Sequence, residues 1–353
     1  MKSIPLIGYS DKISLRSEET ISFKVSSNLK KPFKATLKRS ISADPNPKGV
    51  GIIEEDASKY FKTASFKSRK QVFNPGSYAI SKKIFKVSIK KDLKINVIIF
   101  PTLSLSRKQT ILSFDDLELY IAANGRLTLN INNEQISIKK PLLFRSWYKI
   151  EVKISLSGKV AISQKLVSNI NQNKLINEGK FNVKKIFKSK ITLATLVLKN
   201  KRINHYNGKI ESPKIIADGK TVFDCDLSKN TSSSFVKSNI GPNLLLENFP
   251  TRAVTSSKWD GSEMNWQYNP EHYAAIHFHD DDIYDFEWDT DFKFKIPKNM
   301  PSGIYVMRIE GEGYQDAIPF FVAPKINKTK SKICVLISTF TYSIYGNHAR
   351  VDY

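Results

Sequence analysis

The stretch LELYIAANGRLTLNINNEQISI, residues 117–138, decides the fold class. Three runs of alternating apolar and polar residues are separated by Asn124–Gly125 and Asn132–Asn133. A period of two is typical of a strand with one buried face, and Asn-Gly pairs favour the tight turns of hairpins. The stretch therefore predicts three antiparallel strands joined by short turns.

Similar patterns surround this stretch. RSWYKIEVKISLSGKVAISQ (145–164) repeats the alternation around a turn at Ser157–Gly158, and HYNGKIESPKII (205–216) supplies a late strand. No long amphipathic helical pattern interrupts them. Regular hairpins over this length predict a laminin-G/concanavalin-like jelly roll over residues 75–222.

The N-terminal region predicts a smaller sandwich. ISLRSEETISFKVSS (13–27) and PFKATLKRSI (32–41) alternate at period two, and DPNPKGVG (44–51) is a loop because its prolines and glycines interrupt both helix and strand. We predict an Ig-like β-sandwich over residues 1–74.

The remaining chain predicts two further parts. Residues 223–328 form a β-rich domain that carries HFHDDD (277–282), or else the missing half of the first sandwich. ICVLIS (333–338) is apolar on both faces, as in a buried parallel strand. We therefore expect residues 329–353 to begin an α/β domain and the sequence to be a fragment. The predicted fold class is mostly β: tandem β-sandwiches followed by the first strand of a truncated α/β domain.

Charge and composition restrict the function. The formal net charge is +23, and the lysines alternate with apolar residues, as in KKIFKVSIKKDLKINVIIF (82–100). This is typical of the solvent face of strands, and no nucleic-acid-binding motif accompanies it, so nucleic acid is not an expected partner. Without a long apolar run or a signal-peptide pattern, no membrane span is expected. Cys225 and Cys334 form no metal-binding pair, and a reduced, cytoplasmic compartment is expected.

Several segments resemble one family in order along the chain. They are GYSDKIS (8–14), DPNPKGVG (44–51), NPGSYAI (74–80), FPTRAVTSSKWDG (249–261), PEHYAAIHFHDDDIYDFEWDTDF (270–292), MPSGIYVMRIEGEGYQDAIPFFVAP (300–324) and TFTYSIYGN (339–347). The chain resembles the large (beta) subunit of N,N-dimethylformamidase and its relatives. The block 270–324 is the most specific, whereas residues 81–205 match only as a generic laminin-G-like sandwich.

The resemblance implies an activity and a cofactor. It implies an amidohydrolase that cleaves the C–N bond of small formamides, a small partner subunit, and a homo-oligomer. It also implies a mononuclear iron held by two tyrosines and a glutamate. The family pattern places the first tyrosine ligand on Tyr345, and Tyr342 on a more variable aromatic position. The other ligands are expected beyond residue 353, so we expect this fragment to be inactive alone.

The HFHDDD motif is a second candidate site. On a strand, His277, His279 and Asp281 would share one face, and His-x-His with a carboxylate is a ligand set for iron or zinc. Calcium binding and direct catalytic work are alternatives. We favour a structural polar network at a domain seam, because adjacent aspartates repel unless satisfied, and Arg252 is a candidate partner. The candidate metal ligand is thus Tyr345, with Tyr342, His277, His279 and Asp281 as alternatives.

Two other function classes stay open. The same scaffold suits a non-catalytic β-sandwich module that binds carbohydrate or protein. A basic interaction protein that docks on nucleic acid or an acidic subunit is the third class, which steeply salt-dependent DNA binding would indicate. The sequence contains no Gly-rich phosphate loop, no GxSxG elbow and no Cys/His nucleophile arrangement.

Overall fold

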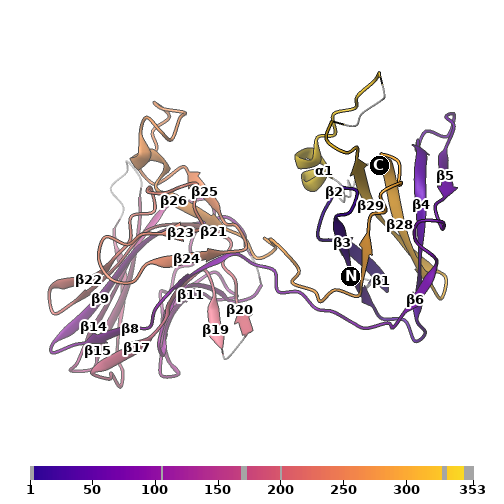
Figure 1. Ribbon diagram of the computed structural model, residues 1–353. Helices are drawn as coiled ribbons and strands as arrows, with labels where there is room; N and C mark the ends of the chain where they lie inside the picture. The colour runs from indigo at the N-terminus through magenta and orange to yellow at the C-terminus, as the bar shows by residue number, and fades with distance from the viewer. Residues whose placement is uncertain (1–3, 105, 168–172, 199–200, 328–331, 346–353) are drawn as a thin grey trace. The chain divides into compact units, whose positions relative to one another are not determined.

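The computed structural model describes residues 4–104, 106–167, 173–198, 201–327 and 332–345, and strands dominate it (Figure 1). Within these residues, β1 to β29 are accompanied by one 3-10 helix, η1 (Pro270–Tyr273), and one α-helix, α1 (Thr339–Tyr345). The predicted mostly β fold with tandem sandwiches is confirmed. The chain divides into a first unit, residues 1–73 with 287–353, and a second unit, residues 74–286.

The first unit contains two sheets. A three-stranded sheet has the order β1-β3-β27, and the other has the order β2-β29-β28-β4-β5 with β6 paired to β4. Only β2 and β29 run parallel among these pairs. The strands are β1 (Leu6–Ser10), β2 (Ser14–Arg16), β3 (Thr20–Ser27), β4 (Phe33–Ala43), β5 (Ile52–Asp56), β6 (Ala64–Phe66), β27 (Phe292–Lys295), β28 (Gly303–Gly311) and β29 (Tyr314–Ala323).

Aromatic rings fill the core of the first unit. Strand β3 alternates as predicted, with Ile21, Phe23 and Val25 buried. The Phe23 ring lies 5.0 Å from Phe292 and 5.9 Å from Phe320, centroid to centroid. These contacts join a strand from the start of the chain to two strands from its end, so neither segment completes the core alone.

The second unit contains two eight-stranded sheets and two short ribbons. The sheet orders are β13-β12-β11-β10-β18-β7-β24-β23 and β16-β15-β14-β9-β21-β26-β25 with β22 on β21, and the ribbons are β17-β8 and β19-β20. The strands of the first sheet are β7 (Tyr78–Ser81), β10 (Gln109–Phe114), β11 (Leu117–Ile121), β12 (Leu127–Ile131), β13 (Glu134–Ser137), β18 (Ile191–Leu193), β23 (Phe235–Val236) and β24 (Leu244–Glu247). The others are β8 (Phe85–Ser88), β9 (Asp92–Pro101), β14 (Tyr148–Ser155), β15 (Lys159–Leu166), β16 (Leu175–Lys180), β17 (Ile186–Ser189), β19 (Leu196–Leu198), β20 (Lys201–Ile203), β21 (Gly208–Ala217), β22 (Lys220–Asp224), β25 (Thr251–Val254) and β26 (Ala275–Phe278).

Strand β9 shows how the lysine-rich pattern folds. Leu93, Ile95, Val97 and Ile99 are buried, while the residues between them, including Lys94, are partly exposed. The expectation that these lysines belong to the solvent face of strands is therefore confirmed here. The apolar half of the strand packs into one continuous core with the residues of the facing sheet.

The predicted division of the C-terminal half is corrected by the structure. Residues 223–328 are not one domain, because the chain changes unit between residues 286 and 287. Strands β24 and β26 pair with β7 and β21 of the second unit, whereas β27, β28 and β29 complete the first. The alternative, that this region supplies the missing half of the first sandwich, holds for residues 287–323 only.

The strand predicted at ICVLIS is wrong. Residues 333–338 form neither strand nor helix, and Ile333, Val335 and Leu336 are 82, 73 and 95% exposed. A strand that is apolar on both faces needs neighbours to cover it, and the described residues supply none. The TFTYSIY segment that follows forms the short helix α1.

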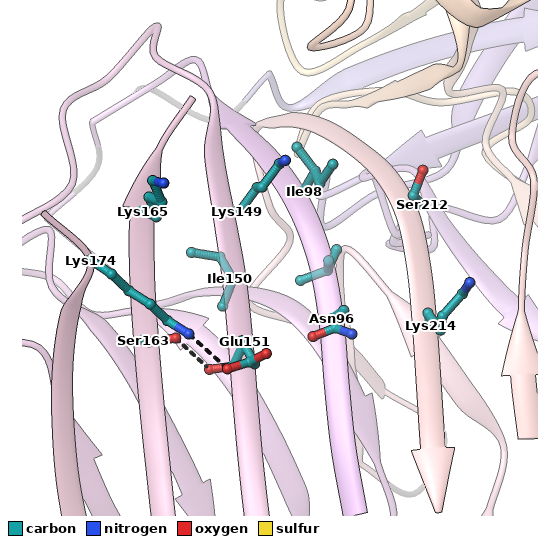
Figure 2. A pocket seen from close by; sticks show the side chains of 11 residues that line it. Asn96, Ile98, Lys149, Ile150, Glu151, Ser163, Lys165, Lys174, Ser212 and Lys214 are labelled. Carbon is teal, nitrogen blue, oxygen red and sulfur yellow. Dashed lines mark hydrogen bonds and ion pairs between the residues drawn. The ribbon is translucent and has the colours of Figure 1, made fainter. Parts of the chain in front are cut away.

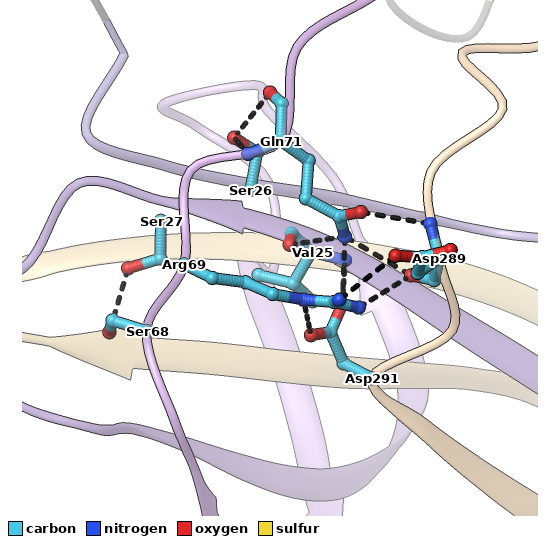
Figure 3. A network of polar contacts seen from close by, with 8 residues as sticks. All are labelled: Val25, Ser26, Ser27, Ser68, Arg69, Gln71, Asp289 and Asp291. Carbon is cyan, nitrogen blue, oxygen red and sulfur yellow. Dashed lines mark hydrogen bonds and ion pairs between the residues drawn. The ribbon is translucent and has the colours of Figure 1, made fainter.

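A polar network fixes the two chain segments that enter and leave the first unit (Figure 3). The Arg69 guanidinium contacts the carboxylates of Asp291, at 2.9 Å, and Asp289, at 3.2 Å. The Gln71 amide also binds both aspartates, and Asp291 accepts the Val25 amide N–H at 2.7 Å. The Asp291 carboxylate uses both of its oxygens in this network, and with the exposed Asp289 it holds residues 69–71 against residues 289–291.

Candidate functional site: the histidine–aspartate cluster

The two histidines of HFHDDD lie at the end of β26 in the second unit. Strand β26 pairs with β21, where His277 lies opposite Lys209, and with β25, where His277 lies opposite Thr251. Phe278 points into the core and is fully buried, so the flanking histidines share the other face, as predicted. Their ring centroids are 3.9 Å apart.

The carboxylate that contacts the histidine pair is Asp282, through His279, and the prediction of Asp281 is wrong. His279 Nδ1 lies 3.1 Å from Asp282 Oδ2. Strand β26 ends at Phe278, so the period of two does not continue through the aspartates. Asp281 is exposed to solvent, and Asp280 forms an ion pair with Arg107.

Two residues from the start of the second unit in the sequence, Gly76 and Ser77, complete the cluster. The Ser77 hydroxyl donates to Asp282 Oδ2 at 2.7 Å and accepts the His279 amide N–H at 3.1 Å. Two backbone bonds run beside it, from Gly76 N to Asp282 O and from Ser77 N to His279 O. The cluster therefore ties the first residues of the second unit to its last ones.

Burial and hydrogen bonding shift the two histidines in opposite directions. Burial, with smaller contributions from His279 and Lys209, lowers the pKa of His277 to about 4. The hydrogen bond to Asp282 outweighs burial and raises the pKa of His279. One ring is thus held neutral next to a ring that binds its proton more tightly.

Unfolding at mildly acidic pH is expected to reveal the lowered pKa of His277. The unfolded chain takes up a proton near pH 6.5 and the folded chain only near pH 4, so His277 destabilises the second unit as the pH falls through this window. The free energy of unfolding of His277→Gln, relative to that of wild type, should therefore increase by on the order of 1 kcal/mol as the pH falls from about 7 to about 5, after allowing for solvent screening. Urea denaturation at several pH values measures this difference.

The control is His279→Gln, for which the free energy of unfolding should change with pH in the opposite direction. A raised pKa contributes stability that is present below the unfolded value and lost as the pH rises through the folded one. His279→Gln should therefore lose stability relative to wild type on acidification. Parallel pH profiles for wild type and both variants would contradict the assignment.

The cluster does not form a metal site from described residues. Three His, Cys, Asp or Glu side chains that could hold one ion do not come together anywhere in the part of the chain that the structure covers. His279 Nδ1 faces Asp282, and His277 Nε2 lies 3.4 Å from the Thr102 hydroxyl. His277, His279 and Asp281 therefore do not converge as ligands.

Arg252 does not satisfy the aspartates, and that hypothesis is wrong. Its guanidinium donates to the backbone carbonyls of Lys229 and Ser233, both at 2.8 Å, and of Leu227 and Asn230, both at 3.3 Å. Burial lowers the pKa of Arg252. The side chain thus fixes the loop at residues 227–233, and Arg107 takes the role expected of it.

The tyrosines of TFTYSIY lie on α1 of the first unit. Tyr342 is half exposed, and its ring centroid lies 5.5 Å from that of Phe321, so it packs against β29. Tyr345 ends α1, and its side chain lies outside the described residues.

Sequence reasoning missed Ser77, Asp282 and Arg107 as members of the cluster. A signal for the first was present, because Ser77 belongs to NPGSYAI, one of the segments that carry the family resemblance. The sequence alone, however, gave no reason to link the Ser77 hydroxyl to aspartates about two hundred positions later in the chain. That link depends on strand pairing across the whole second unit.

Comparisons with known proteins agree with the resemblance. The family described as N,N-dimethylformamidase beta subunit-like, C-terminal, matches residues 251–353. The N,N-dimethylformamidase beta subunit of Paracoccus aminophilus is 26% identical over 404 residues, which cover 98% of this chain and 53% of the relative. The corresponding subunit from Alcaligenes sp is 27% identical over 402 residues, with the same coverage.

Solved structures add nothing to this result. A crystal structure from Bacteroides ovatus is 13% identical, with a TM-score of 0.39, and the match covers 66% of this chain and 68% of that one. A TM-score this low carries no argument about fold or function. Separately, no helix among the described residues is both long and apolar enough to cross a membrane.

The chain has a β-rich fold, and the relatives that it matches are named as subunits of an enzyme. Over 98% of its length the chain is similar to N,N-dimethylformamidase beta subunits, and residues 251–353 match the C-terminal model of that family. The chain spans about half the length of the curated relatives it matches.

Proposed function

We propose that this chain is part of the large subunit of an amidohydrolase that cleaves the C–N bond of small formamides. The observation that carries the proposal is the match of 98% of the chain to two N,N-dimethylformamidase beta subunits. The match covers 53% of each relative, so the activity and substrate of the whole protein belong to the proposal. Hydrolysis would add one water across the amide and release formate and a dialkylamine.

A mononuclear iron belongs to the proposal as the cofactor of the whole enzyme. The described residues do not fit it: three possible His, Cys, Asp or Glu ligands come together nowhere among them, and Tyr342 packs on Phe321. Tyr345 stays the proposed first ligand, with the remaining ligands outside this chain. We derive no step of the reaction through the metal.

The role that the described residues support is scaffolding. Each unit has its own core, and the polar networks at Arg69 and at Asp282 fix the chain where it passes from one unit to the other. We propose that the two units support the catalytic part of the subunit and contact its partners. We propose a small partner subunit and a homo-oligomer as those partners.

The test is hydrolysis by a subunit of the relatives' length that carries this chain as its first half, co-expressed with its small partner subunit. We expect it to release dimethylamine from N,N-dimethylformamide and to contain iron by metal analysis. The 353-residue chain alone should neither hydrolyse the amide nor retain stoichiometric iron. Iron and activity in the isolated chain, or a folded longer protein that is inert toward small formamides, would contradict the proposal.

A further inference from the structure

The outer face of the β16-β15-β14-β9-β21 sheet carries a groove of about 360 Å³ (Figure 2). Its lining includes the side chains of Lys149 and Lys165, together with Lys214, Asn96, Ser163 and Ser212. The volume lies within the ordinary range of small-ligand sites, about 300–1,000 Å³. The histidine–aspartate cluster and α1 contribute no residue to it.

Two lysines occupy opposite positions on neighbouring strands at this groove. Lys149 on β14 lies directly opposite Lys165 on β15, and both side chains are exposed on the same face. Figure 2 shows the two lysine side chains on adjacent strands. Within the described residues neither lysine forms an ion pair, whereas Lys174 binds Glu151 at 2.8 Å and Lys214 binds Asp224 at 3.4 Å.

Such a pair is unfavourable in the free protein. Like charges directly opposite each other on a sheet destabilise it, and the cross-strand register prevents these two from moving apart along the strands. The nearby Glu151 carboxylate forms ion pairs with Lys174 and Lys153 instead. Glu211, in the same cross-strand row as Lys149, is buried and accepts hydrogen bonds from Ser257. An anion between the two lysines would remove the repulsion.

A bulge shapes the other wall of the groove. The register of β21 against β9 shifts between Glu211 and Lys214, and Ser212 adopts a φ of 48°. A positive φ is strained for a serine, and strained backbone is concentrated at functional sites. The bulge leaves the Ser212 side chain exposed in the groove, where its hydroxyl is a free hydrogen-bonding group beside Lys214.

The chemistry of the lining identifies a class of ligand. The lysines suit carboxylates, while the Asn96 amide and the Ser212 hydroxyl suit sugar hydroxyls. The Ser163 hydroxyl is buried and donates to the Glu151 carbonyl. No aromatic residue lines the groove, so nucleic-acid bases would find no stacking surface. The face of a sheet offers no free backbone groups to a peptide main chain, because those groups form the ladders.

We propose that this groove binds an acidic saccharide, a uronate-bearing oligosaccharide whose carboxylate lies between Lys149 and Lys165. The site is separate from amide hydrolysis and does not depend on it. Ion pairing sets the position of the carboxylate, and the rest of the lining, which includes Asn96, Ser212 and the apolar Ile98, contacts the adjacent sugar ring.

Calorimetric titration of the 353-residue chain with a short oligogalacturonate tests the proposal. We expect saturable binding that weakens by about tenfold or more in Lys149→Gln/Lys165→Gln, because each lysine supplies a charge-assisted hydrogen bond. The matched control is Lys188→Gln/Lys190→Gln, which removes the same charge from exposed positions of the second unit away from the groove. The control should keep the wild-type affinity within about twofold.

Thermal melts separate binding from folding. Without ligand, Lys149→Gln/Lys165→Gln should melt no lower than wild type, since the substitution removes a repulsion. With saturating oligogalacturonate, only the wild type and the control should gain melting temperature. Absence of binding by the folded wild type, equal weakening in the control, equal binding of the uncharged galactose oligomer, or equally tight binding of polyglutamate would each overturn the proposal.

Discussion

Replacing Arg69 with alanine should lower the free energy of unfolding of the first unit by about 2–3 kcal/mol. The Arg69 guanidinium forms the ion pair to Asp291, whose side chain is only 6% exposed. Removing the arginine leaves that carboxylate with the Val25 and Gln71 N–H groups but without a counter-charge. A buried charge that loses its partner costs more than the pair itself contributes.

The matched control is Asp289→Ala, the other carboxylate of the network. Its side chain is 82% exposed, and the Asp289 backbone carbonyl still accepts from Arg69 and Gln71 after the substitution. An exposed pair of this kind is worth about 0–1 kcal/mol, so the variant should unfold close to wild type. Urea denaturation of both variants measures the difference. Equal losses in the two variants would show that burial of Asp291 does not decide the effect.

Local patterns explain which parts of the fold could be predicted. Strands β11, β12 and β13 lie within the stretch 117–138, because alternation and the Asn132–Asn133 turn are properties of neighbouring residues. The positive φ values of both asparagines, 53° and 68°, are those that a short hairpin turn requires. Nothing distant is needed to specify this meander.

Long-range pairing explains what was missed. We predicted a domain boundary after residue 222, yet β24 continues the sheet of β7 and β26 continues that of β21. The first unit is discontinuous in sequence, and its closing strand β27 pairs with β3.

At the candidate site, too, some features follow from the local sequence and others depend on the tertiary fold. The shared face of His277 and His279 follows from a period of two and is observed. The partner carboxylate does not follow, because the chain leaves the strand after Phe278 and turns Asp282 back toward Ser77. Arg252 was assigned by charge alone, but its nearest acceptors are backbone carbonyls of a neighbouring loop. Side-chain chemistry predicted that these polar groups would have hydrogen-bonding or ionic partners. The tertiary fold determined which residues supply those partners.

Gly76→Ala should be the most damaging single change at this cluster, with an expected loss of about 2–4 kcal/mol from the second unit. Gly76 has a φ of +108°, a region that alanine rarely adopts. A Cβ at this position would lie 2.4 Å from Cγ of His205, well inside van der Waals contact. Since the Gly76 N–H donates to the Asp282 carbonyl, any backbone shift also disturbs the cluster.

Gly219→Ala isolates the backbone contribution within the same unit. Gly219 has a φ of +80°, and a Cβ there meets nothing within 4 Å, so this variant should lose only about 1 kcal/mol. A double-mutant cycle with His205→Ala then isolates the clash, because Gly76→Ala in that background should cost little more than Gly219→Ala. In Gly76→Ala, a weaker contact between His279 and Asp282 should also lower the raised pKa of His279, measured by NMR titration. If Gly76→Ala costs no more than Gly219→Ala and leaves the His279 titration unchanged, the close packing of Gly76 against His205 does not hold the cluster in place.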